Sequence, residues 1–113
     1  MTPRRACARA AGGSLPPVAK RRIASDETSI QQAVAEVLTA TGGRLDALFN
    51  NGAYACPGLV EDLPRGALRE IFESNVFGWH DLTRQVIPAM RAQGHGRIVQ
   101  CSSVLGLVTL GWR

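Results

Sequence analysis

The feature that most limits how this chain can fold is the distance between its two strand-like runs. The first occupies residues 45–50 and the second residues 97–101, and each follows a turn that contains glycine. The stretch between them is far too long for a hairpin, and long connections join parallel strands through a right-handed crossover. The sequence therefore predicts two neighbouring strands that run in the same direction. Residues 45–49 are nearly all apolar, which suits a strand buried on both faces.

Two amphipathic helical patterns alternate with these runs. Apolar residues recur at helical spacing after Ser25 or Asp26, either of which can cap a helix start, up to the glycine stop at residues 41–43. A longer pattern covers residues 64–92, where Gly78 and Pro88 predict a bend or an early end. The order helix, strand, helix, strand indicates an α/β fold with a parallel sheet.

The amino-acid composition at the start of the chain differs from that of the rest. Residues 1–22 carry six basic side chains and no acidic one, whereas the rest of the chain holds seven arginines against nine acids. Glycine and proline pairs without an apolar period predict a disordered or irregular basic leader over residues 1–25, followed by a globular domain over residues 26–113. A mitochondrial presequence would also be rich in arginine, but it requires an amphipathic helix that these pairs break.

The net charge of +4 at pH 7 therefore comes from the leader and not from a basic folded surface. We expect no nucleic-acid partner. If the leader did bind nucleic acid, deletion of residues 1–22 would abolish that salt-sensitive binding. No apolar run reaches the length of about 18 residues that a membrane-spanning helix requires, so we expect no membrane association.

The cysteines bear on metal binding and on the compartment. Cys7, Cys56 and Cys101 form neither an even-numbered disulfide framework nor a pair with metal-ligand spacing. We therefore expect no metal site and a reducing, cytoplasmic location. Cys101 lies in an apolar run, where a free cysteine usually behaves as a small buried hydrophobe.

Polar clusters follow both predicted strands. Residues 50–52 read Asn-Asn-Gly, and Ser102 and Ser103 follow the second strand. Ligands of open parallel sheets bind beyond the carboxyl ends of the strands, so both clusters would lie on one ligand-binding edge. Taken singly, each signal also has a structural explanation. A hydroxyl after a strand commonly caps the next turn, and Asn75 in mid-helix is commonly solvated.

The order of these signals resembles a known family. Residues 45–108 read LDALFNNGAYACPGLVEDLPRGALREIFESNVFGWHDLTRQVIPAMRAQGHGRIVQCSSVLGLV. This segment is similar to the middle of the classical short-chain dehydrogenase/reductase family, which has NNAG, N-V-x-G and GRIVxxSSxxG at the corresponding places. The resemblance covers residues 26–111. It implies a partial Rossmann-like, doubly wound parallel sheet that is truncated at both ends.

The resemblance also implies roles for individual residues. Ser103, three residues before Gly106, matches the family's catalytic serine, which donates a hydrogen bond to the substrate oxygen as charge develops. Asn75 matches the helix asparagine, whose backbone helps to hold a water in a proton relay.

The cofactor implied by the resemblance is NAD or NADP. The matching positions, Asn50, Asn51, Gly52 and Ala53, would line the adenosine side of the dinucleotide. The family order is Asn-Asn-Ala-Gly, so this chain exchanges the two small residues, and close backbone approach remains possible.

Two family motifs have no match in the chain. The family begins with a strand and the glycine-rich turn Thr-Gly-x-x-x-Gly-x-Gly, which binds the pyrophosphate. Its general acid is the tyrosine of Tyr-x-x-x-Lys. The one tyrosine here, Tyr54, is followed four residues later by Gly58, and the one lysine is Lys20 in the leader. We therefore expect a fragment that is inactive alone, from an incomplete or frame-disrupted gene.

Two functions from different classes follow. The first is an oxidoreductase that moves hydride between a nicotinamide and a small-molecule carbonyl or alcohol, with homo-oligomers expected for full-length members of the family. The second is a non-catalytic dimerisation or interaction fragment, for which Phe77, Trp79 and Val86 would supply an apolar stripe on the long helix.

Overall fold

The computed structural model describes residues 7–9, 26–53 and 55–108. These residues form a small three-stranded sheet, in the order β1-β2-β3, and three α-helices. The strands are β1 (Cys7–Arg9), β2 (Ala47–Asn50) and β3 (Arg97–Gln100), and the helices are α1 (Glu27–Ala40), α2 (Arg65–Phe72) and α3 (Gly78–Ala92).

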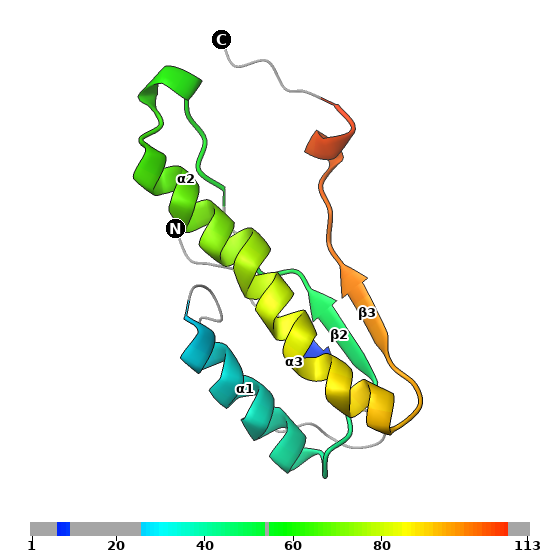
Figure 1. The fold of residues 1–113 in the computed structure, drawn as a ribbon. Helices are drawn as coiled ribbons and strands as arrows, with labels where there is room; N and C mark the ends of the chain where they lie inside the picture. Colours follow the sequence, from blue (N-terminus) through cyan, green and yellow to red (C-terminus); the bar gives the residue numbers. More distant parts are fainter. Residues whose placement is uncertain (1–6, 10–25, 54, 109–113) are drawn as a thin grey trace.

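The strands β2 and β3 are parallel, which confirms the central prediction from the sequence. Leu48 pairs with Ile98 and Asn50 with Gln100. One further hydrogen bond closes the ladder at its carboxyl end, from the Cys101 amide to the Asn50 carbonyl at 2.9 Å. Both arrowheads point toward the same end of the molecule (Figure 1).

The other edge of β2 pairs with β1, in the antiparallel direction. The irregular composition of the leader predicts no strand there, so β1 is a difference between expectation and structure. This pairing can form because the unpaired edge of β2 offers backbone donors and acceptors to any extended segment, whatever the side-chain pattern of that segment. The other leader residues, 1–6 and 10–25, lie outside the described residues.

The first helix has the ends that the sequence predicts. The Asp26 carboxylate accepts a hydrogen bond from the Ser29 amide at 3.0 Å, which satisfies one of the unpaired donors of the first turn of α1. After the helix, Gly42 and Gly43 adopt φ angles of 64° and 84°, the left-handed region that glycine enters without steric cost.

The longer helical pattern is divided into three consecutive segments. A π-helical turn, Glu73–Phe77, lies between α2 and α3, and the Gly78 amide bonds back five residues to the Glu73 carbonyl. The predicted irregularity is therefore located immediately before Gly78, whereas Pro88 is accommodated inside α3.

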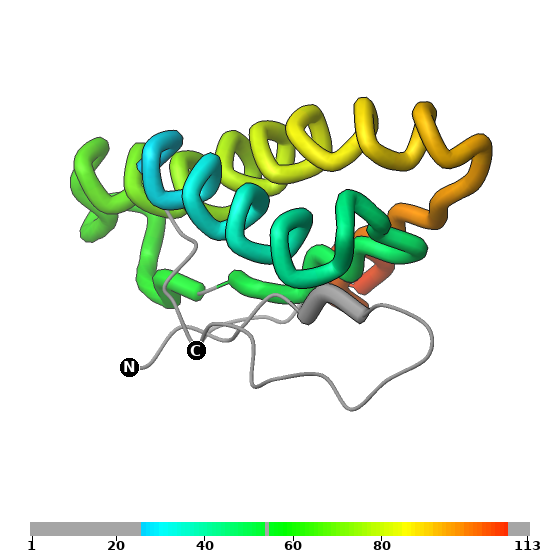
Figure 2. Tube along the Cα trace, turned by 90° about the horizontal axis from the view of Figure 1, so that it is seen from below, coloured from blue at the N-terminus to red at the C-terminus, as the bar shows by residue number. Residues whose placement is uncertain are grey.

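The hydrophobic core lies between the helices and one face of the sheet. Figure 2 shows α1 and α3 side by side on the same side of the strands. The core side chains are Ile30, Val34, Leu45, Leu48, Leu82, Val86 and Met90. No described helix covers the opposite face, so Phe49 is 39% exposed and Val99 is 50% exposed. The prediction that the strand at residues 45–49 is buried on both faces is therefore wrong.

Among the described residues, no helix has the length and the apolar content needed to cross a bilayer.

Truncation of Leu48, which is 2% exposed, should lower the free energy of unfolding by about 2–5 kcal/mol, because the deleted methyl groups leave a cavity in the core. The same truncation at Leu107, which is 88% exposed, should change the free energy by less than about 0.5 kcal/mol. Urea denaturation of Leu48→Ala and Leu107→Ala measures both values. Equal losses would contradict the assigned core.

Candidate functional site

The parallel pairing of β2 with β3 places two polar loops at one edge of the sheet. Asn50 is the last residue of β2, and its carbonyl accepts the amide of Cys101, the first residue after β3. Residues 51–53 and 102–103 therefore leave the sheet from adjacent positions at the same end (Figure 1). The shared edge that the sequence predicts is present.

The Asn50 side chain points into the protein and not toward solvent. It is 0% exposed, and its Nδ2 donates to Thr83 Oγ1 at 3.0 Å and to Gln100 Oε1 at 2.9 Å. Its Oδ1 is buried without a hydrogen-bond partner in the part of the chain that the structure describes. The side chain thus joins β2 to α3 and to β3 beneath the edge.

The loop after β2 lies closer to the surface. Asn51 and Gly52 are half-buried and Ala53 is exposed. Trp79, in the first turn of α3, donates its indole N–H to the Gly52 carbonyl at 2.7 Å. A small, accessible stretch of backbone is therefore held against the long helix.

Ser103 is exposed and caps the turn that follows β3. Its Oγ accepts a hydrogen bond from the Leu105 amide at 3.2 Å, as is common for a serine after a strand. A serine hydroxyl can accept and donate at the same time, so this cap leaves its O–H able to donate to another oxygen. The capping explanation and the proposed chemistry are thus compatible.

Asn75 belongs to a different element from the two polar loops. It is half-buried within the π-helical turn Glu73–Phe77. Single π-helical turns inside α-helices occur frequently at functional sites. Asn75 lies four residues before Trp79, which bonds the loop after β2, so the turn is linked to the candidate edge through α3.

Three contributors at this edge, Trp79, Thr83 and Gln100, are not identified as site residues by the sequence analysis. Trp79 is expected in an apolar stripe for a partner, but its polar atom is used inside the chain. The signal that could have identified two of them is their spacing. Trp79 and Thr83 follow Asn75 at intervals of four residues and thus share one helix face.

Cys101 is exposed, and its thiol lies 3.5 Å from the Ser102 carbonyl. The prediction of a buried Cys101 is wrong, because β3 is exposed along its whole length and Cys101 continues it. In the described ranges no group of three or more His, Cys, Asp or Glu side chains is placed to hold a metal ion.

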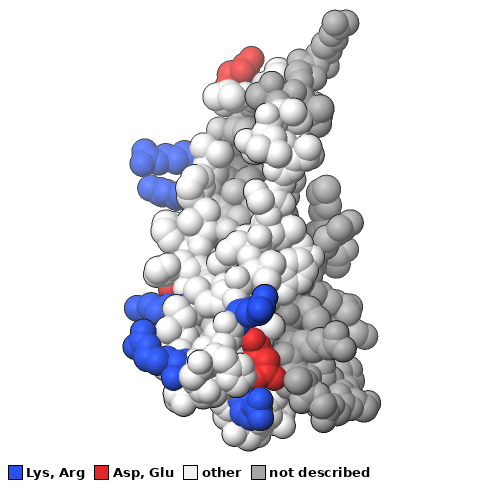
Figure 3. Space-filling view, turned by 90° about the vertical axis from the view of Figure 1, so that its right-hand side faces the viewer, with Lys and Arg blue, Asp and Glu red and all other residues white. Residues whose placement is uncertain are grey.

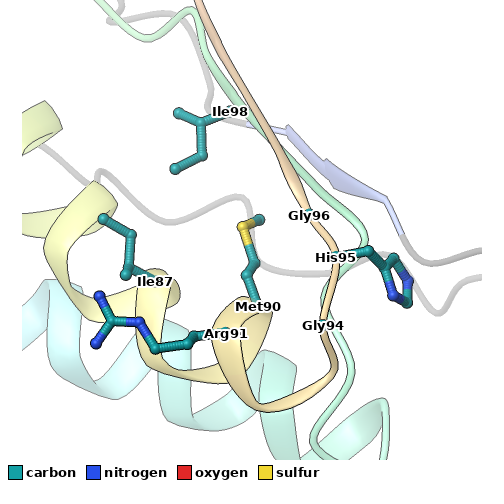
Figure 4. A pocket seen from close by; sticks show the side chains of 7 residues that line it. All are labelled: Ile87, Met90, Arg91, Gly94, His95, Gly96 and Ile98. Atoms are coloured by element: carbon teal, nitrogen blue, oxygen red, sulfur yellow. The ribbon is translucent and has the colours of Figure 1, made fainter.

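A shallow cavity of about 450 Å³, wide open to solvent, lies at the other end of β3, away from the polar edge. Its lining comes from the last turns of α3, the following turn and the start of β3: Ile87, Met90, Arg91, Gly94, His95, Gly96 and Ile98 (Figure 4). The His95 ring points away from this space and pairs with the Asp46 carboxylate at 3.0 Å. None of the predicted site residues lines the cavity.

Comparison with known proteins gives a consistent picture. The family model for short chain dehydrogenase matches residues 18–112. The uncharacterized oxidoreductase YbbO of Escherichia coli (strain K12) is 38% identical over 81 residues, which is 72% of this chain and 30% of that protein. The matched part of the chain thus covers less than a third of the length of this relative.

Two solved structures resemble the described fold. A short-chain dehydrogenase from Streptomyces avermitilis is 37% identical with a TM-score of 0.69, over 76% of this chain and 31% of that one. A variant of actinorhodin polyketide ketoreductase, solved with NADPH, is 30% identical with a TM-score of 0.69, over 75% of this chain and 33% of that one.

Proposed function

The chain belongs to the short-chain dehydrogenase family, and from this membership we propose that it supplies one part of the active site of an NAD(P)-dependent oxidoreductase. The proposed reaction moves hydride between the nicotinamide and a small-molecule carbonyl or alcohol carbon. The single observation that carries the proposal is the parallel pairing of β2 and β3, which brings the residue 51–53 loop and Ser103 to one edge.

The residue 51–53 loop is the proposed contact for the adenosine side of NAD or NADP. Gly52 and Ala53 are small and at least partly accessible, so a dinucleotide can approach their backbone closely. The ketoreductase solved with NADPH supports this cofactor class. When bound, the dinucleotide supplies the hydride, and the protein supplies binding, orientation and proton handling. The buried Asn50 side chain would support the loop from below through Thr83 and Gln100.

Ser103 is the proposed hydrogen-bond donor to the substrate oxygen. Its O–H can donate while its Oγ accepts the Leu105 amide, and that amide fixes the position of the oxygen. A donor aimed at an oxygen that gains negative charge during reaction stabilises the transition state more than the ground state. Asn75 would contribute through its backbone by holding a water for the proton relay.

The proton itself needs a further group. Tyr54 is not followed by a lysine at the family spacing, and Lys20 lies in the leader. We therefore propose that these 113 residues bind the dinucleotide without turning over a carbonyl substrate by themselves. A cytoplasmic location and homo-oligomeric assembly of the longer family members belong to the same proposal.

Titration of the chain with NADPH, followed by calorimetry, tests the proposal. We expect saturable binding that weakens by about tenfold in Gly52→Val, because a branched side chain would occupy the space next to the loop backbone. Gly66→Val is the matched control, since a Cβ at Gly66 meets nothing within 4 Å and its helix lies outside the loop. Failure of the unmodified chain to bind either NADPH or NADH would overturn the proposal.

A second candidate function is self-association through the helical surface before α3. Leu68, Phe72 and Val76 recur at four-residue spacing and are 44%, 52% and 46% exposed, and Phe77 is 50% exposed. Of the stripe expected from the sequence, Phe77 is thus accessible, but Val86 is 2% exposed in the core. The side of the molecule where β3 lies is a different surface, and most of the described residues there are uncharged (Figure 3).

Sedimentation over a concentration series tests this second candidate. Phe72→Glu should shift the chain toward monomer, because a charge would have to be desolvated in the contact. Leu107→Glu, at an exposed apolar position outside this helical surface, should not. A chain that is monomeric at every concentration would exclude the candidate.

A further inference from the structure

The contact between Trp79 and Gly52 joins the residue 51–53 loop to α3. The indole Nε1 donates to the Gly52 carbonyl at 2.7 Å, the short end of the range for N–H···O bonds in proteins. Trp79 is half-buried, so its ring also packs against the protein. An aromatic ring with one polar atom is suited to such a contact, since the ring is held by packing and the N–H is directed at one acceptor.

The neighbouring contact shows that α3 holds this region at two points. Thr83, one turn after Trp79, accepts a hydrogen bond from the buried Asn50 side chain at 3.0 Å. One helix face therefore fixes the last residue of β2 and the second residue after it. Asn51 lies between these two fixed points.

We infer that Trp79 is a positioning residue for the dinucleotide: its indole N–H fixes the Gly52 carbonyl and holds the residue 51–53 loop in a binding conformation. The inference rests on the proposed function. Glycine has more backbone conformations than any other residue, and Gly52 occupies the middle of the loop. Restricting those conformations before binding reduces the entropy that the ligand must otherwise overcome.

In this chain the residue whose backbone the tryptophan bond restricts is a glycine. The loop reads Asn51-Gly52-Ala53, so the flexible residue comes immediately after Asn51. The tryptophan bond acts on the carbonyl of that same residue. Trp79→Phe keeps a smaller aromatic ring at this half-buried position and removes the N–H, so it should free the loop while retaining part of the packing.

The experiment compares the full chain with Trp79→Phe and with Phe72→Leu, a control that changes an exposed aromatic side chain of α2, outside the residue 51–53 loop. Calorimetric titration with NADPH avoids any dependence on tryptophan fluorescence. The loss of one neutral hydrogen bond predicts a dissociation constant raised by about threefold to tenfold in Trp79→Phe, and an unchanged value in Phe72→Leu.

A spectroscopic readout separates positioning from general destabilisation. In Trp79→Phe, amide hydrogen exchange should accelerate and the Gly52 carbonyl carbon resonance should shift, with changes confined to residues 51–53. Exchange at the core residues Ile30 and Val86 should stay as in the unmodified chain. If Trp79→Phe does not fold, hydrogen exchange in the unmodified chain provides a second test of the positioning role. Saturation with NADPH should slow the exchange of the Trp79 indole proton, and no slowing would overturn the inference.

The outcomes distinguish the inference from the proposed function. If the unmodified chain binds NADPH and Trp79→Phe binds it equally well, the inference is overturned and the proposed function stands. If the unmodified chain binds no dinucleotide, the proposed function fails and the positioning role fails with it. Weaker binding in Trp79→Phe, with exchange changes confined to the loop, supports both.

Discussion

The parallel pairing of β2 with β3 is the constraint on which the candidate site depends. Main-chain hydrogen bonds set Leu48 opposite Ile98 and Asn50 opposite Gln100. A shift by one residue would turn every side chain of β3 to the other face of the sheet, so the Asn50–Gln100 side-chain bond of 2.9 Å exists in one register only. Backbone pairing and side-chain pairing thus specify the same arrangement, and that arrangement brings Ser103 and the loop after β2 to the same edge of the sheet.

The helix α3 holds the end of β2 in this arrangement. Its apolar side chains, Leu82, Val86 and Met90, pack into the core, and its polar contacts at Trp79 and Thr83 reach the end of β2. The same element therefore contributes to stability and to the geometry of the proposed dinucleotide contact. A buried donor is costly unless it is bonded, and the two hydrogen bonds of the Asn50 Nδ2, to Thr83 and Gln100, meet that need in this arrangement.

Local signals explain which parts of the structure could be predicted from the sequence. The Asp26 cap, the glycines after α1 and the apolar periodicity each act over a few residues, so α1 follows from them. The direction of the two strands follows from the length of the connection between them. The other features depend on contacts between distant residues. Pairing of β1 with β2 uses backbone atoms alone, the exposure of Phe49 follows from which face the helices cover, and the partners of Asn50 come from α3 and β3. The family resemblance identifies candidate positions but not the side chains that hold them.

Interstrand nuclear Overhauser effects in the isotope-labelled chain test the central claim most directly, because they report which residues of the two strands are neighbours. The account predicts contacts of Leu48 with Ile98 and of Asn50 with Gln100, and a Cys101 amide protected by the Asn50 carbonyl. Contacts of Leu48 with Gln100 and of Asn50 with Ile98, the order of an antiparallel pair, would contradict it.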